Sequence, residues 1–97
     1  MEIFCLRDSK TRFLCPFFAV SAAAAIRNVE HDVQTSGSLI SSHTSDFDLY
    51  HIGGFDDESG IIQAFSTPEF LVSGSSIIAS LYASSRSVDK EVSSDGV

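Results

Sequence analysis

The stretch that decides the fold is FDLYHIGGF at residues 47–55, followed by DDESG at 56–60 and IIQAF at 61–65. Two apolar runs flank an acidic turn that ends in glycine, a pattern typical of a β-hairpin. Gly60 can adopt the positive φ that closes such a turn. Gly53 and Gly54, inside the first run, indicate a bulge or the close approach of another backbone. We therefore expect two antiparallel strands here.

Two further strands and a helix precede this hairpin. Residues 2–7 are apolar on both sides of a strand, which is typical of a central strand. A turn cluster leads to a second apolar run at 12–18, where Pro16 ends the strand or confines it to an edge. Ser21 is the expected cap of a helix over residues 21–35, because four alanines and an apolar stripe follow it.

The order strand, strand, helix, strand, strand predicts one small α+β domain over residues 1–72. We expect a mostly antiparallel four-stranded sheet with one helix packed on a face. A Ser/Thr-rich loop is expected at 36–46, and Pro68 should break the fourth strand. A short helix is the expectation for 73–84. Ser and charged residues dominate 85–97 and predict a disordered, flexible tail.

Composition and charge narrow the class of protein. The 97 residues are 43% hydrophobic and 20% charged, as in an ordinary globular domain. No apolar run approaches the roughly 20 residues of a membrane span, and Glu2 without a basic stretch predicts no secretory signal. We therefore expect a soluble protein in the cytoplasm, without membrane contact.

The net charge of −7 is unevenly distributed. Residues 1–27 hold four cations against two carboxylates, residues 28–70 hold eight carboxylates and no Lys or Arg, and residues 71–97 have a net charge of −1. This asymmetry favours a solvated acidic face, a basic end that meets an anionic partner, or head-to-tail self-association.

Residues that commonly carry chemistry are scattered. Cys5 and Cys15 lie in no Cys-x-x-Cys or Cys/His cluster, and the three histidines lack metal-ligand spacing, so we expect no metal and no cofactor. If residues 3–7 and 12–16 pair, the cysteines face each other and a disulfide is conceivable, although we favour two buried thiols. We find no spacing typical of a catalytic pair and expect no enzyme activity.

Basic and aromatic residues alternate in the first third of the chain. Single-strand nucleic-acid binders combine such cations with aromatic rings that stack on bases. Against this stands the net charge of −7, which repels a polyanion, and in so small a domain we favour the core for these rings. The cations are Arg7, Lys10, Arg12 and Arg27, and the aromatic residues are Phe4, Phe13, Phe17 and Phe18.

Four motifs follow one another along the chain: Asp8-Ser9-Lys10, Pro16-Phe17-Phe18, Ala25-Ile26-Arg27, and residues 46–57 with Gly60 and Pro68. This series resembles the small nonstructural protein of gokushoviruses, which are Microviridae with circular single-stranded DNA. The resemblance covers roughly residues 1–72, with Thr44-Ser45 and Asn28-Val29 as departures from the usual family pattern. It implies a nonstructural protein, made in the cytoplasm of the infected bacterium, that serves DNA replication, packaging or host interaction.

We therefore expect a non-enzymatic phage accessory protein that acts by protein–protein contacts in viral genome replication or packaging, with a viral or host protein as partner. The expected contact residues are carboxylates around the hairpin, Asp46, Asp48, Asp56, Asp57 and Glu58. The alternative is a single-stranded DNA-binding protein that uses the four cations named above. Open sheet edges also favour a homo-oligomer.

Overall fold

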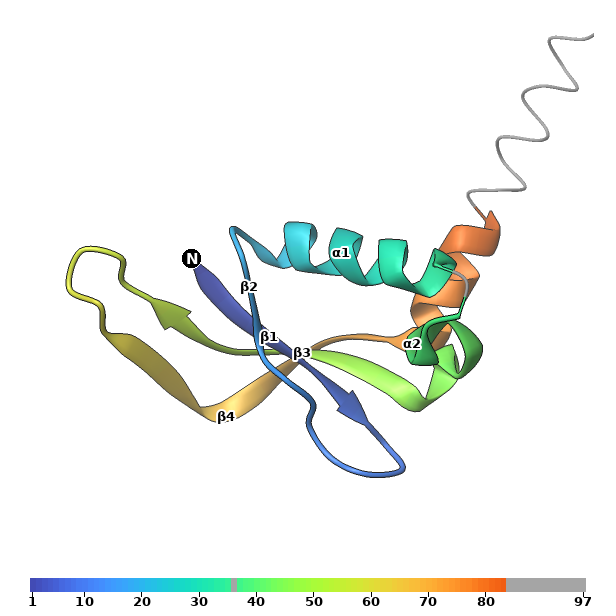
Figure 1. Ribbon diagram of the computed structural model, residues 1–97, viewed down its shortest axis with the longest axis horizontal. Helices are drawn as coiled ribbons and strands as arrows, with labels where there is room; N and C mark the ends of the chain where they lie inside the picture. The colour runs from blue at the N-terminus through green and yellow to red at the C-terminus, as the bar shows by residue number, and fades with distance from the viewer. Residues whose placement is uncertain (36, 84–97) are drawn as a thin grey trace, which may run out of the picture.

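The computed structural model describes residues 1–35 and 37–83 and confirms the α+β class, with a four-stranded antiparallel sheet and a helix across one face (Figure 1). The tail predicted for 85–97 lies outside the described residues. In chain order the elements are β1 (Glu2–Asp8), β2 (Phe17–Ala19), α1 (Ala22–Gln34), α2 (Leu39–Ser42), the 3-10 turn η1 (Thr44–Asp46), β3 (Phe47–Phe55) and β4 (Ile62–Ser73), and residues 74–83 are helical.

The sheet has the strand order β2-β1-β3-β4, and all neighbours are antiparallel. β1 is central, as its two-sided apolar pattern predicts. β2 has three residues and is shorter than the predicted run at 12–18. Before Pro16, that run pairs with β1 through an isolated bridge between Arg7 and Phe13. Pro16 explains the interruption, because proline has no N–H to donate to a neighbouring strand.

The core lies between the sheet and α1. The Ser21 hydroxyl accepts a hydrogen bond from the Ala24 N–H at 3.1 Å, which confirms the predicted helix start, and α1 ends at Gln34, before the predicted Gly37. Strand alternation places one side chain of every two under the helix. The buried apolar cluster consists of Phe4, Ala19, Ala25, Val29, Ile40, Phe47, Leu49 and Ile77.

The expected loop at 36–46 is wrong, because this segment contains α2 and η1. The Ser38 hydroxyl caps α2 by accepting a hydrogen bond from the Ser41 N–H at 3.0 Å. The Thr44 hydroxyl donates to the Ile40 carbonyl, and both side chains are buried. A helix of four residues is too short to show the 3.6-residue periodicity from which helices are predicted.

The predicted hairpin is confirmed in β3 and β4, and Gly60 closes its turn with a φ of +76°. The predicted break at Pro68 is wrong, because β4 continues to Ser73. Residues 65–68 lie between the pairs His51↔Glu69 and Gly53↔Ala64 and form an irregular bulge. The bulge leaves Pro68 without a ladder partner, so a strand can contain it.

The two glycines of β3 differ in the space around them, which gives a stability test. A Cβ at Gly53 would clash with the Gln63 carbonyl oxygen, whereas a Cβ at Gly54 would meet the Glu2 carboxylate at 3.7 Å. We expect Gly53→Ala to lower the free energy of unfolding by about 1–3 kcal/mol. The matched Gly54→Ala should change it by less than about 0.5 kcal/mol. Urea unfolding of both variants measures this, and equal effects would contradict the close approach of β4 to Gly53.

Candidate interaction surface

The face of the sheet that points away from α1 carries a row of aromatic side chains; we call this the open face. Tyr50 lies between Leu49 and His51 in β3 and therefore points to the side opposite the core. Its ring makes edge-to-face contacts with Phe13, at 5.2 Å between centroids, and with Phe70 of β4, at 5.8 Å. Phe18 and Phe55 form a second edge-to-face pair on this face, at 5.9 Å.

These side chains are open to solvent. Phe13 is 41% exposed, Phe18 51%, Phe70 54% and Ile62 60%. In the described part of the chain no helix lies against this face (Figure 1). A contiguous exposed apolar patch is typical of an interaction site in a small protein.

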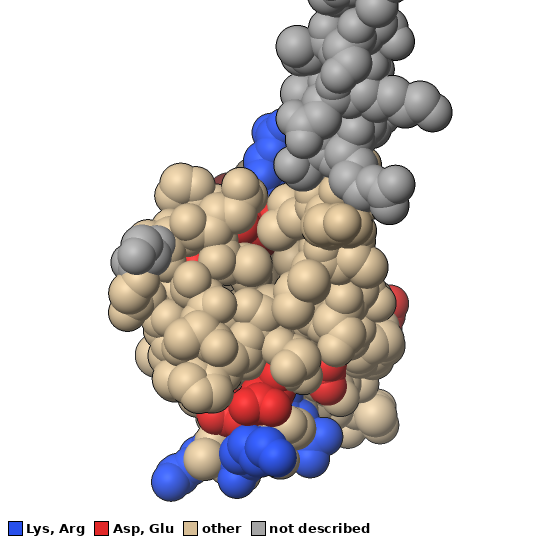
Figure 2. Space-filling view, turned by 90° about the vertical axis from the view of Figure 1, so that its right-hand side faces the viewer, with Lys and Arg blue, Asp and Glu red and all other residues tan. Residues whose placement is uncertain are grey.

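The open face has cations at one end, where β1 leads into the turn at residues 9–12. The Arg7 guanidinium carbon lies 5.8 Å from the Phe13 ring centroid, a cation–π arrangement. Lys10 and Arg12 are exposed in the turn. Carboxylates lie directly beside these cations, above them in the view of Figure 2, yet among residues 1–35 and 37–83 no Lys or Arg has a carboxylate oxygen within 4.0 Å. Arg27 is on α1, so the structure separates it from the other three.

The hairpin turn forms an acidic tip at the other end of β3. Asp56 Oδ1 accepts the Glu58 N–H at 3.0 Å, and this bond, with one from the Ser59 hydroxyl, lowers the pKa of Asp56. Asp56 therefore stays ionised further into the acid range than a free aspartate. Asp48 is eight residues back along β3, about 26 Å away at roughly 3.3 Å per residue. The structure thus divides the predicted acidic surface into two groups, one of which, Asp46 and Asp48, lies beside the basic turn.

The aromatic residues singled out from the sequence also divide into two sets. Phe4 and Phe17 contact each other on the α1 side, where Phe4 is fully buried. Phe13 and Phe18 lie exposed on the open face, contrary to the expectation that they fill the core. Sequence reasoning missed Tyr50, Phe55 and Phe70 as surface residues. Alternation along the hairpin strands is the signal that could have found Tyr50, because its neighbours Leu49 and His51 share the opposite side.

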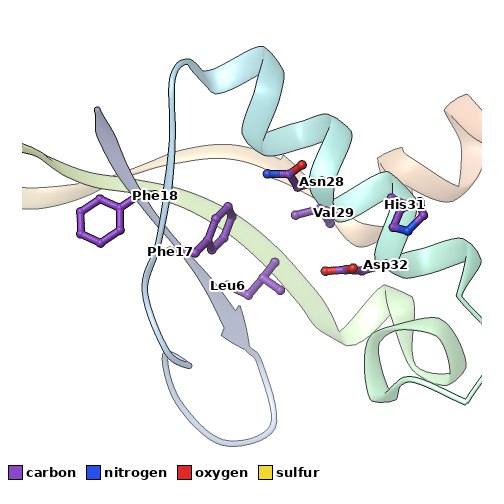
Figure 3. Close-up of a pocket in the computed structure, with 7 residues that line it drawn as sticks. All are labelled: Leu6, Phe17, Phe18, Asn28, Val29, His31 and Asp32. Atoms are coloured by element: carbon purple, nitrogen blue, oxygen red, sulfur yellow. The ribbon is translucent and has the colours of Figure 1, made fainter.

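A cleft of about 460 Å³ lies between α1 and the sheet, and Phe18 of the edge strand β2 borders both this cleft and the open face. Figure 3 shows Leu6 and Phe17 reaching from the sheet towards Val29 and Asp32 of α1. An apolar floor with a few polar groups at its rim suits a ring or an apolar side chain. Across residues 1–35 and 37–83, no three His, Cys, Asp or Glu side chains are grouped so that they could hold a metal ion.

The two cysteines lie near each other, because Arg7 pairs with Phe13 and the Leu14 N–H donates to the Leu6 carbonyl. Both thiols are nevertheless free. Cys5 is buried and its S–H donates to the Leu14 carbonyl at 2.9 Å. Burial raises the pKa of the Cys5 thiol, an effect that the bond to Leu14 partly offsets. Cys15 is exposed, so the expectation of two buried thiols is wrong for this residue.

Comparison with known proteins identifies a family. The sequence profile of a family described as Phage ORF5 protein matches the chain over residues 1–77, which is most of its length. No curated protein and no solved structure matches it. No helix in the described segments has the length and apolar character needed to cross a membrane.

The unequal burial of the cysteines predicts their reactivity. At mildly alkaline pH we expect Cys15 to react quickly with a water-soluble aromatic disulfide, and Cys5 to react only when denaturant is added, because the thiolate is the nucleophile and burial disfavours it. Absorbance of the released thiol measures both phases. Cys15→Ser should remove the fast phase and Cys5→Ser the slow one. Two fast thiols in the native protein would contradict the burial of Cys5.

Proposed function

Because the chain belongs to the Phage ORF5 protein family, we propose that this phage protein is a non-enzymatic accessory protein that works through protein–protein contacts of its open face. Its partner is a viral or host protein, and the contact serves viral genome replication or packaging. The site of action is the cytoplasm of the infected bacterium. The observation that supports this proposal best is the exposed aromatic face itself.

The open face has the composition of a protein interface. Interfaces combine an apolar, aromatic-rich centre with a polar rim, and here the rings of Phe18, Tyr50 and Phe70 lie between charged groups at both ends of β3. Burying one such ring fully is worth roughly 1.5–3 kcal/mol. The carboxylates of the acidic tip are suited to steering and orienting a partner at the rim.

We also propose a narrower family assignment for this chain. The ordered motifs from Asp8 to Pro68 support an assignment to the small nonstructural protein of gokushoviruses. Those motifs include Asp56, Asp57 and Gly60 of the hairpin turn. They contribute residues of the acidic tip and of the basic turn, but only some of the aromatic residues on the open face. The assignment therefore supports a nonstructural role, whereas the choice of contact surface depends on the geometry of the open face.

The proposal is tested by placing a charge on the open face. We expect Phe70→Asp to lower the capture of the phage or host partner from infected cells at least about tenfold, because a central aromatic residue commonly contributes roughly 2 kcal/mol or more to binding. Mass spectrometry identifies and quantifies the captured protein. Leu39→Asp is the matched control, since Leu39 is 60% exposed and lines a groove on the core side. Equal capture by both variants would refute the open face as the contact surface.

A second candidate function, binding of single-stranded DNA, is favoured by one specific observation. Arg7, Phe13, Tyr50 and Phe70 form a continuous row in which a cation is followed by three rings. Stacking of bases on such rings is tolerant of sequence and combines with cations along the backbone. The net charge of −7 opposes this function at long range.

Titration of a fluorescent single-stranded oligonucleotide distinguishes this second candidate. If Arg7, Lys10 and Arg12 each neutralise one phosphate, log affinity should fall with log salt with a slope of about −2, from roughly −0.7 per phosphate. The triple substitution of these cations to Ala should abolish the salt dependence, while Arg27→Ala should leave it unchanged. Absence of binding at low salt would eliminate DNA as the ligand.

A further inference from the structure

We infer that the open face binds a second copy of this chain, with the two β3 strands antiparallel across a twofold axis. The inference shares with the proposed function only the premise that the open face is a contact surface, and it names one occupant of that face. Three features support it: the charges at the two ends of β3, the outline of the molecule, and the aromatic residues between those two ends.

The two ends of the open face differ in charge: one has exposed cations beside Asp46 and Asp48, and the other has consecutive carboxylates. Lys10 and Arg12 are exposed in the turn after β1, and in the described ranges neither has a carboxylate oxygen within 4.0 Å. Residues 56–58 at the hairpin tip are three consecutive carboxylates with no Lys or Arg beside them in the sequence. Figure 1 shows the turn after β1 and the hairpin tip at opposite ends of the sheet.

A twofold axis brings these charges together. In a twofold dimer the same patch faces itself, so each contact is made twice. With antiparallel β3 strands, the basic turn of one copy lies against the acidic tip of the other at both ends. A parallel arrangement would instead place the two acidic tips face to face.

The outline of the chain fits this arrangement. Figure 1 shows the turn after β1 projecting away from α1, whereas the hairpin tip bends back towards the helix side. In the antiparallel arrangement the projecting turn of one copy therefore passes beside the receding tip of the other. Charge and shape favour the same orientation.

The middle of the open face supplies the apolar contact. Packed sheets lie about 10 Å apart, and their side chains interdigitate. Around the axis, the pair Phe18–Phe55 of one copy meets the row of Tyr50 and Phe70 in the other. The exposed halves of these rings are buried in the dimer.

Charge reversal at each end tests the orientation. Lys10→Glu with Arg12→Glu changes the net charge from −7 to −11, and Asp57→Lys with Glu58→Lys changes it to −3. If only the net charge mattered, the dimer of the −11 variant would be weaker than that of the original chain, and the dimer of the −3 variant would be stronger. The antiparallel contact instead requires both reversals to raise the dissociation constant, by at least about tenfold each. Arg7 and Asp56 are left unchanged because they take part in ring and turn contacts.

The decisive variant combines both reversals, because exchanged ends are again complementary and the net charge returns to −7. We expect it to restore the dissociation constant of the original chain within about threefold. Sedimentation velocity over a concentration series of the full chain measures the dimer. Arg27→Glu with Glu30→Lys, an exchange of charges on α1, is the control and should have no effect. Circular dichroism shows whether each variant is folded.

Three results would overturn the inference: a monomer at all concentrations, a dimer that persists in Phe70→Asp, or reversals that do not compensate each other. A monomer that still captures its partner through the open face refutes self-association and leaves the proposed function intact. A dimer that is lost in Phe70→Asp, while capture of the partner is unchanged, supports self-association and refutes the proposed function. A monomer that binds the oligonucleotide assigns the face to DNA instead.

Discussion

The placement of every described helix on one side of the sheet is the constraint on which the rest of the structure depends. α1, α2 and the helix at 74–83 all contribute to the same buried cluster, through Val29, Ile40 and Ile77. A chain of this length buries a modest share of its surface. Here the helices bury one face of the sheet. The aromatic residues of the other face therefore remain exposed as a direct consequence of where the helices lie.

Much of the fold follows from local sequence signals. The hairpin turn, the helix cap at Ser21 and the central position of β1 are each predicted by patterns within a few residues. Other features depend on distant neighbours. Pro68 is accommodated because four residues of β4 bulge against one of β3, and no local pattern encodes that register. The exposure of Phe13 and Phe18 likewise depends on the absence of a second helix layer in the described chain, which composition does not reveal.

Local charge matters more than net charge for the function of this surface. The chain is acidic as a whole, yet Lys10 and Arg12 lie together in the turn after β1. The three consecutive carboxylates at 56–58 follow the far end of β3. A protein partner, a nucleic acid and a second copy of the chain would each contact a different part of this charge distribution. The apolar centre is common to all three, so a charge introduced there tests the surface, and charges changed at its ends identify the ligand.

The central position of β1 has a consequence for the order of synthesis. β1 emerges early, but its partner β3 begins about 40 residues later, which at roughly 5–20 residues per second means a delay of roughly 2–8 seconds. During that interval Phe4 can meet Phe17 but not His51, and one apolar strand edge is left without its partner. The strand at the centre of the finished sheet is thus the part of the nascent chain that waits longest for its main partner, and it is the segment most exposed to mispairing at the ribosome.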